Sequence, residues 1–203
     1  MLTGEGNTTQ FVECSFSGTY AGGQPYALNG EPVCVITING GEPQFHQCSI
    51  SENDAGMSGI VHQRGGSGLW YEGVFYNNNA FASEGTYECA GGTPTFHQCL
   101  FANNNSREGT VYFDSTGVDG AWLMNLLHCN FEGNSTSGDQ YGGAVQVVCD
   151  DCEGDAPEIS FSNCGFNGNN GNLGLGLYDI DSPYFPMYRI ASDINDNGVV
   201  TDV

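Results

Sequence analysis

The 203-residue chain contains no lysine and only three arginines, Arg64, Arg107 and Arg189, against 24 aspartates and glutamates. Its formal net charge at pH 7 is therefore −21. A chain so poor in cationic side chains cannot neutralise a row of phosphates, and an anionic membrane surface repels it. We therefore expect no nucleic-acid partner and no direct membrane insertion.

Long apolar runs are also missing, since no stretch approaches the 18 or so residues of a membrane span. The amino-terminal sequence MLTGEGNTTQ has neither the basic region nor the apolar run of a targeting segment, and we expect the chain to be part of a longer protein. Hydrophobic residues still make up 39% of the chain, which is enough to fill a core. We therefore expect a folded chain with the length of one domain.

The sequence repeats itself: GGEPQFHQC at 40–48 and GGTPTFHQC at 91–99 agree at seven of nine positions. With their cysteine as an anchor, related segments occur along the chain, each with a large apolar residue three positions before the anchor and another two positions after it. These segments are FVECSF (11–16), FHQCSI (45–50), WYEGVF (70–75), FHQCLF (96–101), LLHCNF (126–131) and FSNCGF (161–166). The anchors are 25 to 35 residues apart, which indicates a repeat protein.

Two further elements recur after each anchor. An asparagine stands three residues past the apolar position, and we expect it to mark a tight corner, because asparagine tolerates the left-handed backbone region. Its copies are ISEN (50–53), FYNN (75–78), FANN (101–104), FEGN (131–134) and FNGN (166–169). A glycine then opens a short β-like run, as in SGIVHQ (58–63), EGTYEC (84–89), EGTVYF (108–113) and GGAVQV (142–147).

These patterns predict an all-β chain, a right-handed parallel β-helix (solenoid) of six to seven coils over residues 1–185, followed by a terminal segment at 186–203. Apart from a brief ambiguity at 121–128, no helical periodicity is sustained. A solenoid brings equivalent positions into contact on successive coils, whereas a sandwich or propeller needs no identical residue in each repeat. We expect two interior rows, formed by the anchor cysteines (14, 48, 99, 129, 164) and by Phe16, Ile50, Phe75, Phe101, Phe131 and Phe166.

The FxxN segments at 75–78, 101–104, 131–134 and 166–169, together with GGAV at 142–145, resemble the repeats of the polymorphic outer membrane proteins. More broadly, they are similar to the right-handed β-helix group that includes pectate-lyase-like proteins. The resemblance covers about residues 10 to 180 and implies the same fold. It also implies that a polysaccharide lyase would combine acidic calcium ligands with a basic residue, and that a related glycoside hydrolase would use clustered aspartates. The only adjacent aspartates here are Asp150 and Asp151.

Nine cysteines suggest an oxidising compartment and leave at least one thiol unpaired. We interpret the anchor cysteines as small buried hydrophobic residues, with disulfides between neighbouring coils as the alternative. Parallel in-register side chains point the same way, which disfavours such disulfides. Cys149 and Cys152, which flank Asp150 and Asp151, are the strongest disulfide candidates. A zinc site would need a second pair of ligands at suitable spacing.

His46 and His97 occupy the same repeat position, and His128 is displaced by one residue, so these histidines can form a stacked row on one face. No serine, cysteine or carboxylate recurs with them as a nucleophile and base pair. The sequence therefore assigns no catalytic residue.

Two kinds of modification or ligand site are also predicted. The sequons at Asn7, Asn104 and Asn134 are candidates for glycosylation in a eukaryotic source, with glycans projecting outward from the FxxN corner. The tail at 191–203 resembles the start of a type I dockerin repeat, and calcium is its candidate cofactor. The ligand positions of this partial loop are Asp193, Asn195, Asn197, Val199 and Thr201, and a solvated acidic turn is the alternative.

We expect a non-catalytic extracellular or cell-surface β-helix that acts as a structural, adhesive or filament-forming segment of a larger assembly. Its expected partners are flanking coils, domains or like subunits, because an open solenoid end exposes strand edges. The alternative is a carbohydrate-active domain that binds or cleaves polysaccharide along one strand face. An exposed aromatic row would favour it, with candidates Tyr71, Tyr76, Tyr112 and Tyr141. Ice binding ranks last, because the threonines are scattered.

Overall fold

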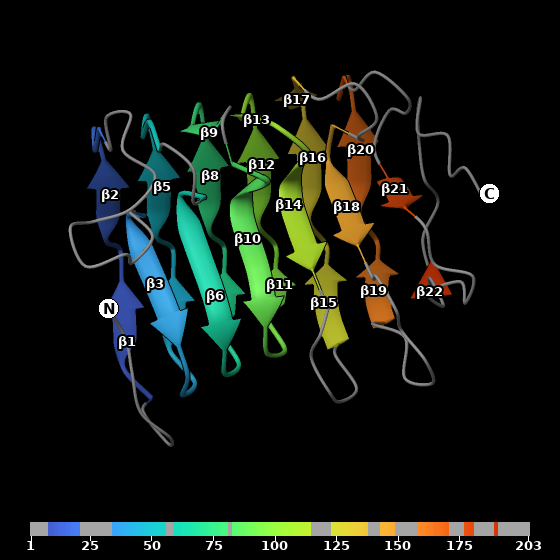
Figure 1. The fold of residues 1–203 in the computed structure, drawn as a ribbon. Coiled ribbons are helices and arrows are strands. Elements are labelled where there is room, and N and C mark those ends of the chain that lie inside the picture. The colour runs from blue at the N-terminus through green and yellow to red at the C-terminus, as the bar shows by residue number, and fades with distance from the viewer. Residues whose placement is uncertain are drawn as a thin grey trace.

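The computed structural model describes residues 8–20, 34–55, 59–80, 83–114, 123–137, 143–148, 158–170, 177–180 and 189–190. Within these residues it contains 22 β-strands and no helix (Figure 1). The prediction of an all-β chain is confirmed. The stretch with ambiguous periodicity contains a strand at Leu123–Leu127.

Four parallel sheets contain these strands. Sheet I comprises β1 (Gln10–Val12), β4 (Gln44–His46), β7 (Leu69–Tyr71), β11 (Thr95–His97), β15 (Leu123–Leu127), β19 (Glu158–Ser162) and β22 (Arg189–Ile190). Sheet II comprises β2 (Ser15–Ser17), β5 (Ser49–Ser51), β8 (Val74–Tyr76), β12 (Leu100–Ala102), β16 (Asn130–Glu132) and β20 (Gly165–Asn167). Sheet III comprises β3 (Ile36–Asn39), β6 (Val61–Gly65), β10 (Gly85–Gly91), β14 (Gly109–Asp114), β18 (Val145–Val148) and β21 (Leu177–Ile180). Sheet IV comprises β9 (Asn79–Ala80), β13 (Asn105–Ser106) and β17 (Ser135–Thr136).

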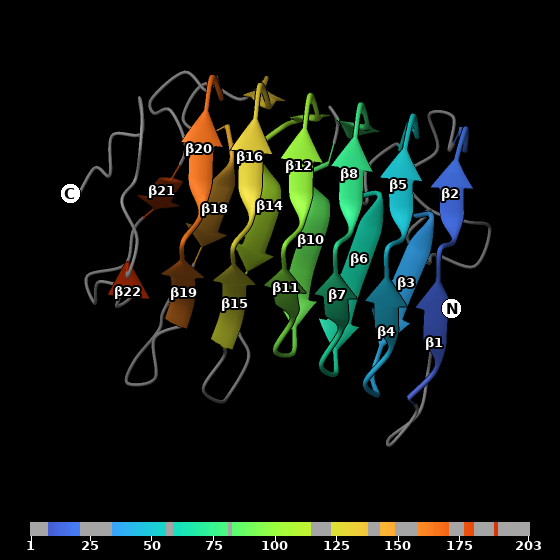
Figure 2. The same cartoon turned by 180° about the vertical axis from the view of Figure 1, so that it is seen from behind.

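Each strand pairs in parallel with its counterpart in the next repeat, so the six strands of sheet II number the repeats from one to six. A repeat passes through sheet I, sheet II and sheet III in turn. Sheet III forms one layer, and sheets I and II lie end to end in the other (Figure 2). This stacking is compatible with the predicted β-helix.

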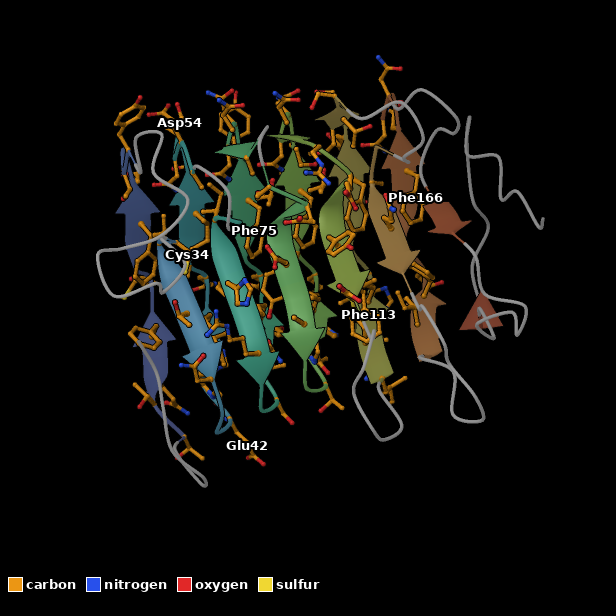
Figure 3. The ribbon with its side chains drawn as sticks, viewed as in Figure 1. Cys34, Glu42, Asp54, Phe75, Phe113 and Phe166 are labelled. Atoms are coloured by element: carbon orange, nitrogen blue, oxygen red, sulfur yellow. The ribbon has the colours of Figure 1, made fainter. Side chains whose placement is uncertain are left out.

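In-register rows of apolar side chains fill the space between the layers. The rings of Phe75, Phe101, Phe131 and Phe166 stack with centroids 4.6, 4.7 and 5.0 Å apart. Phe113 of sheet III is also fully buried (Figure 3). Burying one such side chain stabilises the fold by about 1.5–3 kcal/mol, so this row is a main source of stability. The predicted phenylalanine row is therefore present.

Repeat three departs from the pattern by exchanging volume between two positions. Its anchor is Gly73 where the other repeats have cysteine, and its preceding apolar residue is Trp70 where they have phenylalanine or leucine. Trp70 is fully buried and stacks on Phe45 with a centroid distance of 3.8 Å. A Cβ atom on Gly73 would lie 3.7 Å from the Trp70 ring. The larger indole thus occupies space that the missing cysteine leaves.

The anchor cysteines form the second predicted interior row, and they do so as free thiols. Cys14 of repeat one is half-buried, whereas the later members are at most 3% exposed. These buried members are Cys48, Cys99, Cys129 and Cys164. Cys34 and Cys89 are free as well, so none of the cysteines in the described residues forms a disulfide. For these residues the cysteine count is no sign of an oxidising compartment, because the thiols serve as small core side chains.

The asparagines that follow each apolar residue form a third interior row. Asn104 Nδ2 donates to Phe75 O at 2.9 Å and to Asn134 Oδ1 at 3.0 Å, and its Oδ1 accepts from Asn78 Nδ2 at 2.9 Å. The left-handed backbone falls one residue earlier, at Asn103 (φ 53°) or Gly133 (φ 61°). The predicted corner is present, but its left-handed residue is the one before the asparagine, whose own side chain bonds inside the fold.

Candidate functional site

The outer side of sheets I and II is almost free of charge. In repeats one to four, the strands of these two sheets contain no charged residue, although the whole chain has a net charge of −21. The next two repeats add Glu132 in β16 and Glu158 in β19. We call the outer side of the strands of sheets I and II in repeats one to six the neutral face (Figure 2).

The centre of the neutral face is apolar. Trp70 and Phe75 point inward from β7 and β8, so their neighbours in the same strands point outward. These neighbours are Leu69, Tyr71, Val74 and Tyr76. Tyr76 is 43% exposed and the others are half-buried. An outward apolar group of this kind, bordered by polar residues such as Ser49 and Ser51 of the adjacent strand, is typical of an interaction surface.

A row of left-handed residues lies between sheets I and II, at the middle of the neutral face. Its members in repeats one to six are Glu13, Gln47, Glu72, Gln98, His128 and Asn163, with φ between 51° and 55°. Gln47 Nε2 donates to Glu72 Oε2 at 2.6 Å. His128 is exposed. This row, which we call the seam, adds two glutamates and one histidine to the neutral face.

The predicted histidine row lies on the neutral face but is interrupted. His46, Tyr71 and His97 are in register, with ring centroids 5.9 Å apart for the first pair and 5.0 Å for the second. His128 meets His97 from the seam at 5.6 Å. In the described residues these histidines contact one another and Tyr71 through their aromatic rings.

A different polar cluster lies on the outer side of sheet III. Thr37, His62, Glu88, Tyr112 and Gln146 are in register on successive strands. Arg64 Nε donates to His62 Nε2 at 3.0 Å, so the neutral imidazole carries its proton on Nδ1. That Nδ1 atom lies 3.1 Å from Glu88 Oε1 but makes no well-aligned hydrogen bond.

Carboxylates at this cluster raise the pKa of neighbouring groups. Burial raises the pKa of Glu84, and the charges of Glu88 and Glu108 raise it further, against a lowering by Arg107. Burial also raises the pKa of the Tyr112 phenol, as do the surrounding carboxylates. Among the described residues, no group of three or more histidine, cysteine or acidic side chains is arranged to hold a metal ion. The cluster is a polar row beside the ion pair of Arg107 Nη2 and Glu108 Oε1, which are 2.6 Å apart.

Sequence reasoning missed this cluster. The four glycine-led runs carry a polar or ionisable residue at their fifth position, His62, Glu88, Tyr112 or Gln146, directly after a buried residue that points inward. That alternation is the signal that could have placed the four side chains on one outer row. Glu88 Oε2 and both side-chain polar atoms of Gln146 are buried without a hydrogen-bond partner.

The predicted aromatic candidates divide between the two layers. Tyr71 and Tyr76 lie together on the neutral face, whereas Tyr112 is only 7% exposed on the outer side of sheet III. Tyr141 lies outside the described residues. Of the three candidates in the described residues, Tyr71 and Tyr76 share a face and Tyr112 lies on the other layer.

The sequons do not project outward. Asn104 and Asn134 are fully buried, and their Nδ2 atoms donate hydrogen bonds in the interior row. The folded chain cannot carry a glycan on either nitrogen, so the expectation of outward glycans at this corner is corrected. Asn7, the aspartate pair Asp150–Asp151, the candidate disulfide Cys149–Cys152 and the whole partial calcium loop at 193–201 lie outside the described residues.

No protein-family model, curated protein or solved structure matches this chain. The described residues contain no helix long and apolar enough to cross a membrane.

Proposed function

We propose that this chain is a right-handed parallel β-helix that serves as a non-catalytic structural, adhesive or filament-forming segment of a larger extracellular or cell-surface assembly. The observation that carries the proposal is the neutral face, with its apolar centre on β7 and β8. On a chain of charge −21, a surface whose strands carry no charge in repeats one to four is where a partner can approach with the least electrostatic repulsion. Right-handedness follows from the strong preference of parallel strand connections for that hand.

Repeat one supports a second contact at the end of the stack. Phe11 and Phe16 are half-buried, whereas their counterparts Phe45 and Ile50 are at most 1% exposed. Phe11 stacks on Phe45 with a centroid distance of 4.9 Å. A further coil, a domain or a like subunit against this end would complete the burial of both rings.

Binding of an uncharged polysaccharide is the second candidate function. It is favoured by the position of Tyr71 and Tyr76 on one face, because aromatic rings offer apolar surfaces to the faces of sugar rings. The amide of Gln44, on the strand next to β7, can exchange hydrogen bonds with hydroxyl groups. An acidic polysaccharide would be repelled by the net charge.

Retention and turnover measurements test the proposal. The purified chain is applied to neutral and acidic insoluble polysaccharides and to immobilised chain, and the soluble products are quantified. Non-catalytic contact predicts retention that falls severalfold in the Tyr71→Ser and Tyr76→Ser variants, with no product released. Turnover that is lost in Glu88→Gln but not in Tyr76→Ser would show an enzyme and overturn the proposal.

A further inference from the structure

We propose that the neutral face is the contact between two copies of this chain, packed antiparallel about a two-fold axis that runs along the strand direction of β11 and β12. This inference rests on the proposed function and deepens it by naming the partner. In such a dimer the same surface serves both copies, so it must be complementary to itself.

Charge selects the face. Two chains of charge −21 repel each other, and they can come into contact only where few acidic side chains meet. The outer side of sheet III bears Glu84, Glu88, Glu108 and Asp114, which makes it unsuited to self-association. The strands of the neutral face carry no charge in repeats one to four.

Symmetry fixes which residues meet. A two-fold axis in the plane of the face and parallel to the strands keeps each position along a strand and reverses the order of repeats. With the axis on repeat four, repeat three faces repeat five of the second copy, and repeat two faces repeat six. Residues of sheet I then face sheet I of the second copy, and the seam faces the seam of the second copy.

This register gives complementary pairs at the centre of the face, whereas Glu42 and Glu158 occupy equivalent positions of repeats two and six and meet at the edge of sheet I. In the seam, Glu72 faces His128 of the second copy, and Gln98 faces Gln98 of the second copy. On the strands, Tyr76 faces Glu132 of the second copy, so that its hydroxyl group can donate to the carboxylate, and Tyr71 faces Leu127. A shift of the axis to repeat three would instead place Glu72 against Glu72 of the second copy, which like-charge repulsion disfavours.

The contact is large enough for a specific dimer. Five overlapping repeats at about 4.8 Å per strand span about 24 Å, and seven extended residues across sheets I and II span about 23 Å. The face then covers about 550 Å² per copy, or about 1,100 Å² in total, which exceeds the roughly 1,000 Å² expected of a biological interface.

A charge-exchange series tests the register by sedimentation equilibrium of the full chain at neutral pH. We expect the dimer dissociation constant to rise about tenfold in Glu72→Lys and in His128→Glu, because each loses the pair and His128→Glu creates a like-charged one. The double variant Glu72→Lys/His128→Glu restores the pair in exchanged form and should return within about threefold of the parent. Both positions already hold non-glycine residues at φ 52° and 55°, so the substitutions add no backbone strain.

Asp114→Lys is the matched control for Glu72→Lys, because it changes the net charge by the same amount at the end of β14 in sheet III, away from the neutral face. Its dissociation constant should be unchanged or lower than that of the parent. A dimer dissociation constant that neither single variant changes would overturn the inference, and so would a chain that stays monomeric at all concentrations. A monomer that neutral polysaccharide retains through Tyr71 would do so as well, while the proposed contact function would stand.

Discussion

The interior asparagine row shows how a single residue type can be required at each repeat. Asn78, Asn104 and Asn134 each donate to a backbone carbonyl and to the next asparagine, while the same side-chain oxygen accepts from the preceding one. A carboxylate cannot donate, and a hydroxyl group is too short to span two repeats. The residue before each asparagine makes the left-handed turn, which divides the two tasks between neighbours.

Asn104→Ala should lower the free energy of unfolding by about 2–4 kcal/mol, because it leaves buried donors of Asn78 and the carbonyl of Phe75 without partners. Chemical denaturation measures the change. The exposed neighbour provides the control: Asn103→Gly should be neutral or stabilising by up to about 1 kcal/mol, since glycine adopts φ 53° without strain. A larger loss in Asn103→Gly than in Asn104→Ala would contradict the assignment of the two roles.

The carboxyl group of Glu84 makes the stability of the fold depend on pH. Its pKa is raised in the folded chain, chiefly by burial, so ionisation destabilises the fold as pH rises through the unfolded value of about 4.3. Glu84→Gln should therefore raise the melting temperature at pH 7, and the gain should vanish below about pH 4. The exposed Glu42→Gln controls for the loss of one negative charge. A gain confined to acidic pH would refute this sign.

At the scale of elements, two glycines differ in how much space surrounds them: Gly73 between β7 and β8, and Gly91 at the end of β10. A Cβ on Gly73 would lie 3.4 Å from Cys99 Sγ, which is ordinary van der Waals contact, so the site has room for a methyl group. A Cβ on Gly91 would overlap the carbonyl oxygen of Arg64 on the adjacent strand. Glycine is thus required where β6 and β10 approach closely and is dispensable on the anchor row.

Gly73→Ala should raise the free energy of unfolding by about 0.4–1 kcal/mol, because alanine restricts the unfolded chain without straining the folded one. Gly91→Ala should lower it, because the backbone of β6 or β10 must shift. Thermal unfolding of the two variants beside the parent gives the comparison. Equal effects of the two substitutions would contradict the contacts assigned to these glycines.

The elements also show where sequence reasoning was sufficient. The anchor and FxxN segments were placed correctly because an in-register stack puts equivalent residues in contact, and the same side chain therefore recurs. His62, Glu88, Tyr112 and Gln146 share one outer row but differ chemically, since outward residues need not match their neighbours. A search for identical residues could not find them.

At the scale of the whole molecule, charge is unevenly distributed between the two layers. The strands of sheets I and II hold no charged residue in repeats one to four, whereas β6, β10 and β14 of sheet III hold Arg64, Glu88 and Asp114. The net repulsion of a chain with charge −21 opposes its compact state. Ionic strength should therefore affect stability.

Raising sodium chloride from about 0.1 M to about 1 M shortens the Debye length from about 10 Å to about 3 Å and should raise the melting temperature. The double variant Glu42→Gln/Glu52→Gln, which removes two exposed charges, should show a smaller increase. Calorimetry at several salt concentrations provides the measurement. A melting temperature that falls with salt in the parent chain would mean that attractive ion pairs outweigh the net repulsion.

The sequence by itself determined the all-β class, the repeat length and the identity of the interior cysteine and phenylalanine rows, because each of these is a property of one position repeated along the chain. Only the tertiary structure decided that Asn104 and Asn134 turn inward, that Trp70 fills the space beside Gly73, and that the strands of sheets I and II, uncharged in repeats one to four, form one face. These features depend on which side of a strand a residue occupies and on what the neighbouring repeat places beside it. Repeats of 25 to 35 residues vary in their loops, so that neighbour is defined by hydrogen-bond register between strands and not by distance along the chain.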